Sequence, residues 1–278
     1  MKRLALYCLA MVATPAVAQG VAAESPPPGS PALRELCSER PGLTTAACTV
    51  DPGHVQIEVG FGNWTLDSRE DEREDRIEAG DILLRYGLGR TTEVQLGWIA
   101  YGHVRTLDRT ADDVSTSQGT GDVTLALKQN LRHPAEGKTG FAVALLPSVT
   151  LPVGSGEVGQ GDWSAGLVIP ASYKLNDTIS FALSPEIDAA VDQDRSGRHL
   201  AYGAAVAVQV HLTEALRLSP EVQFIRDEDP DGRTTLSVAS LSLDVRAAKM
   251  TQFDIQAVAG LNADTPDLKL SCGISHKF

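Results

Sequence analysis

Apolar and polar residues alternate along most of the chain between Gly53 and its last residue, Phe278. A repeat of two residues is the period of a β-strand, whereas an amphipathic helix repeats about every 3.6 residues. The pattern predicts about twelve strands, each near the roughly 9–11 residues that a tilted strand needs to cross a membrane. We expect them at 54–65, 77–87, 91–103, 120–131, 139–151, 162–174, 177–190, 198–211, 214–226, 233–246, 250–262 and 267–278.

The connections between these strands alternate in length. The short ones include GLGR, LNDT, LTEA and AAKM, with RHPAEGK the longest of that group. The others are LDSREDERED, TLDRTADDVSTSQG, PVGSGEVGQGD, DQDRSGR, RDEDPDG and NADTPD. Short periplasmic turns and longer outside loops are typical of outer-membrane barrels. We therefore predict an all-β, antiparallel transmembrane β-barrel over 53–278, with both of its ends at the periplasmic side and the acidic loops outside.

The alternative fold is an exported soluble β-sandwich. The composition of the polar face of the strands distinguishes it from a barrel. That face holds isolated charges among Gly, Ala and Ser, namely Glu58, Arg85, Glu93, Lys128, Glu186, Asp188, Arg217, Glu221 and Asp254. A water-exposed face would be denser in charged residues and Thr, whereas small residues with sparse charges suit a narrow lumen. In lipid, moreover, only closure satisfies every backbone group of a sheet. We expect these charges to form a polar constriction with a mild cation preference.

Some strands carry irregular features. Pro147, Pro170, Pro185 and Pro220 each remove a ladder donor, so each predicts a bulge or a strand end. In the strand 233–246 the apolar positions change parity between Val238 and Leu241, which predicts a bulge there.

The first residues have the features of a secretory signal. Lys2 and Arg3 precede an apolar run that ends in Ala16-Val17-Ala18, so we expect a signal peptide at 1–18 with cleavage after Ala18. Residues 19–52 are Pro-rich and polar, and we expect a short, extended periplasmic segment. The sequence leaves open whether this segment enters the lumen as a plug.

Two cysteines, Cys37 and Cys48, lie in that segment. In an oxidising compartment they would form a disulfide that closes a loop of about 12 residues and stabilises it by roughly 3 kcal/mol. The alternative is a pair of free thiols.

The charge and the scattered histidines exclude some function classes. The formal net charge is −12, and nucleic acids require a basic face, so we expect no nucleic-acid partner. The six histidines are scattered and no G-x-S-x-G motif is present, so we do not expect an enzyme. Glu186 and Asp188 have the spacing of an acid pair along one strand, but lumen charges are the simpler interpretation.

Two of the long loops share a pattern of alternating aspartates before a glycine. DQDRSG contains Asp192 and Asp194, and DEDPDG contains Asp227, Asp229 and Asp231. Alternate oxygens before a glycine turn can wrap Ca²⁺, yet the Glu expected at the twelfth position is absent. Ordinary turn chemistry explains the same residues. Apart from this weak Ca²⁺ site, no cofactor is predicted.

Several segments resemble a family of outer-membrane transporters named for the MetA pathway of phenol degradation. They are GDVTLALKQNL at 121–131, LLPSVTLPVG at 145–154, GDWSAGLVIPASYKL at 161–175 and SPEIDAAVDQD at 184–194. The resemblance covers most of the chain from Gly53 to Phe278, and it implies transport of small aromatic or other apolar compounds. The terminal Phe278 on an alternating strand also resembles the signal that barrel-assembly machinery reads in the bacterial outer membrane.

A barrel of about twelve strands lies between eight strands, which side chains fill, and sixteen, which leave a water channel. We therefore expect a narrow passive channel for small solutes, embedded in outer-membrane lipid and lipopolysaccharide. The alternative is a closed barrel with a structural or adhesive role.

Overall fold

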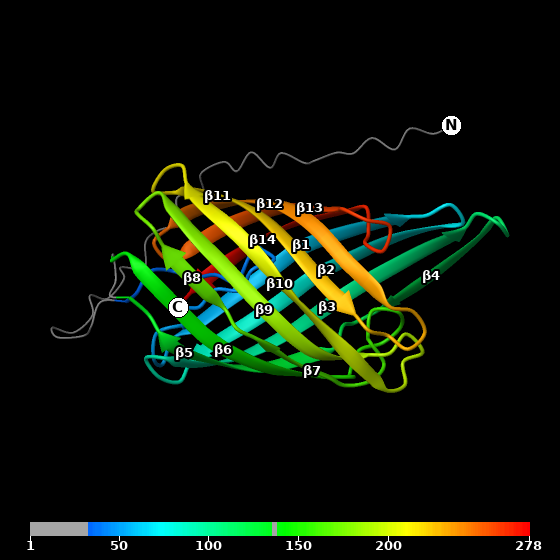
Figure 1. Cartoon of the computed structure of the whole chain (residues 1–278), viewed down its shortest axis with the longest axis horizontal. Coiled ribbons are helices and arrows are strands. Elements are labelled where there is room, and N and C mark those ends of the chain that lie inside the picture. The colour runs from blue at the N-terminus through cyan, green and yellow to red at the C-terminus, as the bar shows by residue number, and fades with distance from the viewer. Residues whose placement is uncertain (1–32, 135–137) are drawn as a thin grey trace, which may run out of the picture. The chain divides into compact units, whose positions relative to one another are not determined.

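The computed structural model describes residues 33–134 and 138–278, and the predicted signal peptide lies outside them. All regular elements of the described residues are strands (Figure 1). They are β1 Val55–Ser68, β2 Glu72–Gly87, β3 Thr92–Asp108, β4 Asp113–Gly119, β5 Val123–Arg132, β6 Gly140–Leu151, β7 Ser164–Val168, β8 Ala171–Lys174, β9 Ile179–Val191, β10 Arg198–His211, β11 Leu216–Asp227, β12 Thr234–Ala248, β13 Thr251–Gly260 and β14 Leu268–Lys277. These residues include no helix long and apolar enough to cross a membrane.

The strands form one closed antiparallel sheet. β4 and β5 follow one another along the same edge of β3, and β7 and β8 do so along β6, so fourteen strand segments build a barrel of twelve wall strands. β14 pairs with β1, from Lys277 opposite Gln56 to Leu268 opposite Leu66, and this pairing closes the barrel. The predicted fold is confirmed, and a two-sheet sandwich is excluded.

The barrel is apolar outside and polar inside, the reverse of a water-soluble protein. On β9, Phe181 and Ile187 are exposed on the outer face, whereas Ser184 between them is buried inside. On β13, Ile255 is 56% exposed while its neighbour Asp254 is 3% exposed. Exposed apolar residues recur around the wall in this way, and such a surface is stable when lipid rather than water surrounds it.

The prolines behave differently from one another. Pro170 interrupts the predicted strand 162–174 and separates β7 from β8, since it has no N–H for the ladder. Pro147, Pro185 and Pro220 instead lie within β6, β9 and β11. The bulge predicted between Val238 and Leu241 is wrong, because β11 and β12 pair there without a break in register.

Two segments that we expected to be loops are largely strands. β1 continues to Ser68 and β2 begins at Glu72, and the next hairpin likewise extends β3 to Asp108. Their charges pair within the hairpin, for example Arg73 with Asp75 at 2.8 Å. A dense run of charges looks like a loop in the sequence, but strands that project beyond the lipid are in water, where charged side chains are compatible with pairing.

Candidate functional site

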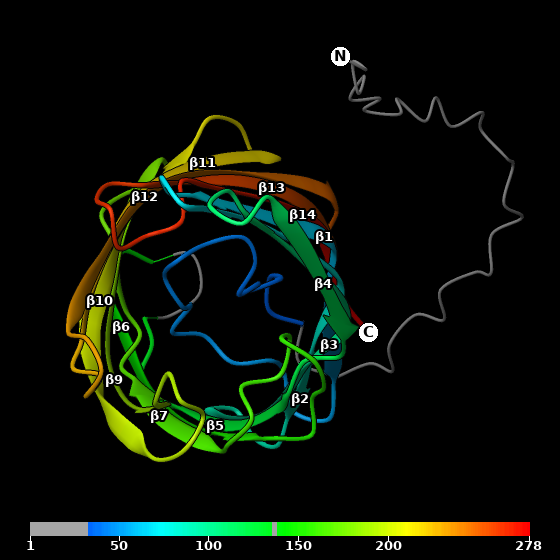
Figure 2. The ribbon, with the colours of Figure 1, turned by 90° about the vertical axis from the view of Figure 1, so that its right-hand side faces the viewer.

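The chain from Arg34 to Asp51, which we call the plug segment, passes through the interior of the barrel. Figure 2 shows it in blue inside the ring of strands. A disulfide joins Cys37 to Cys48 within it, with 6.4 Å between their Cα atoms. Ala47 packs in an apolar cluster with Ala142 and Ala144 of β6. Most other contacts between the segment and the wall are polar.

Glu58 on β1 holds the first half of the plug segment. Its carboxylate is fully buried and accepts hydrogen bonds from the Ser38 hydroxyl at 2.9 Å and the Arg40 backbone N–H at 2.9 Å. The Glu39 backbone N–H lies 3.1 and 3.0 Å from its two oxygens. A carboxylate that accepts several N–H and O–H groups satisfies its lone pairs without water, which makes its burial tolerable.

Arg85 on β2 links the wall to both cysteines of the disulfide. Its guanidinium donates to the carbonyl of Cys37 at 2.6 Å and to that of Cys48 at 3.3 Å. It also pairs with Glu58 at 3.0 Å and with Glu93 at 2.9 Å. The planar guanidinium has five donors in a fixed geometry, so one side chain can hold two carbonyls and two carboxylates.

Lys128 on β5 and Glu93 on β3 hold the second half of the plug segment. The Lys128 ammonium pairs with the Glu39 carboxylate and donates to the carbonyl of Ala46 at 2.8 Å. Glu93 accepts the backbone N–H of Val50 at 2.6 Å. Burial alone would raise the pKa of Glu39, but the charges of Lys128 and Arg85 outweigh it and lower that pKa, so Glu39 is ionised at neutral pH.

Two further anchors lie elsewhere around the wall, and Glu221 is the one far from Glu58 and Lys128 in the strand order. Glu221 on β11 accepts the backbone N–H groups of Leu43 and Thr44 at 2.8 and 3.2 Å, and the Thr44 hydroxyl at 2.7 Å. Asp254 on β13 pairs with Arg40 at 3.3 Å. The plug segment is therefore bound on both sides of the lumen.

The end of the plug segment is tied to the last strand. The Lys277 ammonium lies 2.9 Å from the Asp51 carboxylate and donates to the carbonyl of Arg34 at 2.6 Å. Arg34 in turn pairs with Asp51 at 2.8 Å. Burial tends to raise the pKa of Asp51, but the hydrogen bonds from Arg34 and Lys277 lower it overall.

The structure thus divides the nine lumen residues expected from the sequence. Six contact the plug segment, and they are Glu58, Arg85, Glu93, Lys128, Glu221 and Asp254. Two of the other three have partners in the wall. Glu186 accepts from Gln223 at 3.0 Å, Asp188 is half-buried on the same face of β9, and Arg217 pairs with Asp244 at 2.8 Å.

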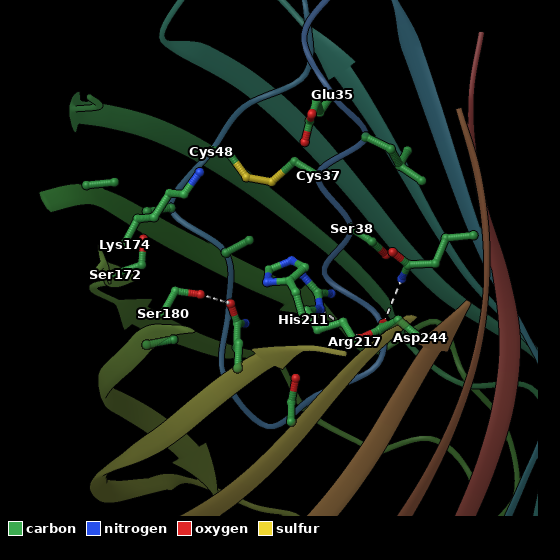
Figure 3. A pocket seen from close by; sticks show the side chains of 18 of the residues that line it. Glu35, Cys37, Ser38, Cys48, Ser172, Lys174, Ser180, His211, Arg217 and Asp244 are labelled. Atoms are coloured by element: carbon green, nitrogen blue, oxygen red, sulfur yellow. Dashed lines mark hydrogen bonds and ion pairs between the residues drawn. A yellow bond between two sulfur atoms is a disulfide. The ribbon is translucent and has the colours of Figure 1, made fainter. Parts of the chain in front are cut away.

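A cavity of about 870 Å³ lies between the plug segment and the wall, at the end of the barrel with the short turns. Figure 3 shows Lys174, His211 and Arg217 from the wall around this space, together with the disulfide of the plug segment. The lining combines apolar surface with both acidic and basic side chains, so the space suits a small solute rather than a lipid chain.

The aspartates of the two long loops separate into two groups. Asp192, Asp227 and Asp229 surround the imidazole of His199 near the outer end of β10. Asp194 and Asp231 are exposed.

Sequence reasoning missed several residues of the site. His199 was dismissed as one of six scattered histidines, and Glu39 and Arg40 lie in a segment without any period. Lys277 was detectable, since it falls on the polar parity of the last strand, but nothing in the sequence indicated its partner Asp51.

The family model described as "Putative MetA-pathway of phenol degradation" matches residues 38–278. The chain belongs to this family. An outer-membrane channel from Pseudomonas putida F1 has a similar structure, with a TM-score of 0.69 and 15% identity over 86% of this chain and 99% of that chain. The NanC porin aligns with a TM-score of 0.50 and 9% identity, over 81% and 100%. At these identities the likeness shows the fold, which is that of outer-membrane barrels. A comparison with curated proteins found no match.

Proposed function

We propose that this protein is an outer-membrane channel for the passive passage of small solutes, and that the plug segment closes it in the state described here. The observation that carries the proposal is the polar attachment of the plug segment. Hydrogen bonds and ion pairs can be exchanged for water when a segment leaves, so a segment held in this way can be released into a hydrated lumen.

Four of the wall charges remain paired with one another when the plug segment is removed. Arg85 lies between Glu58 and Glu93, and Lys128 is 3.8 Å from Glu93. Removing one partner of a buried ion pair is strongly unfavourable because it leaves an uncompensated charge. Here withdrawal of the plug segment leaves these four wall residues with partners and admits water to them, so an open state is accessible.

The cavity and the family indicate the kind of solute. Its volume of about 870 Å³ is in the range of roughly 300–1,000 Å³ that is usual for small-molecule sites. The description of the family refers to a pathway of phenol degradation, which supports small aromatic compounds among the solutes. The predicted absence of catalysis stays a prediction.

Single-channel conductance in a planar bilayer tests the proposal. We expect short, infrequent openings for the mature chain and long, stable conductance steps for a variant that lacks residues 19–52. If the plug-free barrel conducts no ions, the alternative is favoured, which is a closed barrel with a structural or adhesive role. The observation that supports this alternative is that the plug segment occupies the lumen.

Export and assembly follow from the same proposal. We infer that residues 1–18 are removed after Ala18, and that the barrel-assembly machinery reads Phe278 before the barrel enters lipid and lipopolysaccharide. Phe278 is 63% exposed, and its backbone N–H donates to the carbonyl of Val55 at 2.8 Å, at the seam that closes the barrel. Phe278→Ala should lower the amount of protein in the outer membrane, and Phe253→Ala on β13 is a matched control for the loss of an exposed aromatic ring.

A further inference from the structure

Two loops meet at the end of the barrel that carries the long connections. One, Asp192–Gly197, joins β9 to β10, and the other, Glu228–Arg233, joins β11 to β12. β10 pairs with both β9 and β11, so its first residues lie between the two loops. His199 is the second residue of β10, and its side chain is only 5% exposed.

Three carboxylates surround the His199 ring. Its Nδ1 atom is 2.9 Å from the Asp192 Oδ1 atom and 3.4 Å from the Asp229 Oδ2 atom. Its Nε2 atom is 2.9 Å from the Asp227 Oδ1 atom. The ligand atoms of Asp192, His199 and Asp229 all lie within 4.8 Å of one another. Two carboxylates thus face one ring nitrogen, which can donate a proton to only one of them.

The other ring nitrogen provides an independent observation. Nε2 is buried and, among the described residues, has no hydrogen-bond partner with acceptable geometry, although Asp227 is near. Buried polar atoms are nearly always satisfied, so such an atom requires an explanation. A metal ion on Nδ1 supplies one, because it forces the ring proton onto Nε2, where a small rotation directs it to Asp227. Metal-bound histidines usually donate their second N–H to a carboxylate in this way.

We propose that Asp192, His199 and Asp229 bind a divalent transition-metal ion of the zinc type, with Asp227 orienting the imidazole. Zinc–ligand distances near 2.0–2.1 Å place the donor atoms of a tetrahedral site about 3.3 Å apart. The observed separations of 2.9 and 3.4 Å from Nδ1 bracket that value. Three protein ligands leave a fourth position for water. The ion would connect the two loops over the barrel end.

The donor set argues against Ca²⁺, which the loop pattern alone suggested. Ca²⁺ takes about six to eight oxygen ligands, whereas imidazole nitrogen with carboxylates suits zinc, nickel or copper. Asp194 is exposed and does not belong to the group of Asp192, His199 and Asp229 whose ligand atoms lie close together. It is therefore outside the proposed site and offers a control within the same loop.

The test is a titration of the refolded mature chain in detergent with Zn²⁺, after treatment with chelator. We expect one ion per chain by calorimetry and a higher melting temperature with Zn²⁺ than with Ca²⁺. His199→Gln and Asp192→Asn should each weaken binding by about tenfold or more, and Asp227→Asn by about tenfold. Asp194→Asn should leave binding unchanged. Cu²⁺ in place of Zn²⁺ should show coupling to a single nitrogen in its electron paramagnetic resonance spectrum.

Two results would overturn the proposal. If the mature chain takes up no stoichiometric Zn²⁺, the cluster is a protonated histidine held by carboxylates. If His199→Gln binds as the wild type does, the ion occupies another site, such as one of the remaining histidines. Slow migration of unboiled protein on a gel reports that each variant is folded. Should His199→Gln not fold, Asp192→Asn and Asp227→Asn decide the question, because they change one oxygen to an amide of the same shape.

Discussion

The backbone N–H of Glu39 in the plug segment lies within hydrogen-bond distance of both carboxylate oxygens of Glu58 on β1, at 3.1 and 3.0 Å. The wall thus binds the plug segment through main-chain groups as well as through side chains. Main-chain recognition needs the segment in one conformation, and the Cys37–Cys48 disulfide restricts the segment to a compact loop.

Weakening the two main carboxylate anchors should open the channel. In the double variant Glu58→Gln and Glu221→Gln, each anchor loses charge-assisted hydrogen bonds worth about 1.5–3 kcal/mol. We expect the mature chain to conduct far more often than the wild type, as measured by open probability in a planar bilayer. Glu186→Gln is the matched control, since this carboxylate also faces the lumen but its hydrogen bond goes to Gln223 in the wall. Equal open probabilities in the double variant and the control would contradict the role of the anchors.

Acid should loosen the plug segment. The pKa of Glu39 is below its ordinary value of 4.5 when the segment is in place, because the pull of Lys128 and Arg85 exceeds the effect of burial. A depressed pKa stabilises the bound segment fully above the ordinary value, and this contribution is lost as the pH falls through the lower one. The contribution of Glu39 should therefore be constant between about pH 7 and 5, and openings should increase below about pH 4 as it is lost. In Glu39→Gln this acid response should be smaller, with more openings already at neutral pH.

Reduction of the disulfide should also favour opening. The link closes a short loop and limits the freedom of the released segment by roughly 3 kcal/mol. We expect the double variant Cys37→Ser and Cys48→Ser, or the wild type with a thiol reductant, to conduct more often. Cys272→Ser controls for the loss of a thiol, since Cys272 lies on β14 and is free. A reductant that acts equally on the double variant and on the wild type would show that its effect has another origin.

The ion preference of the plug-free channel should depend on β9. Glu186 and Asp188 are half-buried on the lumen side, whereas Arg85 and Lys128 together neutralise Glu58 and Glu93. The double variant Glu186→Gln and Asp188→Asn should move the reversal potential in a salt gradient toward that of an unselective pore. An unchanged reversal potential would show that other residues set the local field.

Local chemistry was enough to predict the wall of the barrel. Strand side chains point alternately to the two faces of the sheet. In segments such as Val123–Arg132, the alternation of apolar and polar residues therefore indicates which side chains face the lipid and which face the lumen. The alternation of short and long connections indicates which connections lie together at each end of the barrel. The charged hairpin at Leu66–Asp75 was misjudged because its composition resembles a loop, and only cross-strand pairing distinguishes the two.

The sequence by itself therefore determined the fold class, the membrane-facing surface and the residues that face the lumen, because each depends on neighbours two residues apart. Tertiary structure alone decided what those lumen residues do. Ser38 reaches Ser275 across 237 positions, and His199 meets Asp229 only after three strands are in register. Contacts of that range leave no period in the sequence, since they depend on where the closed barrel places each strand.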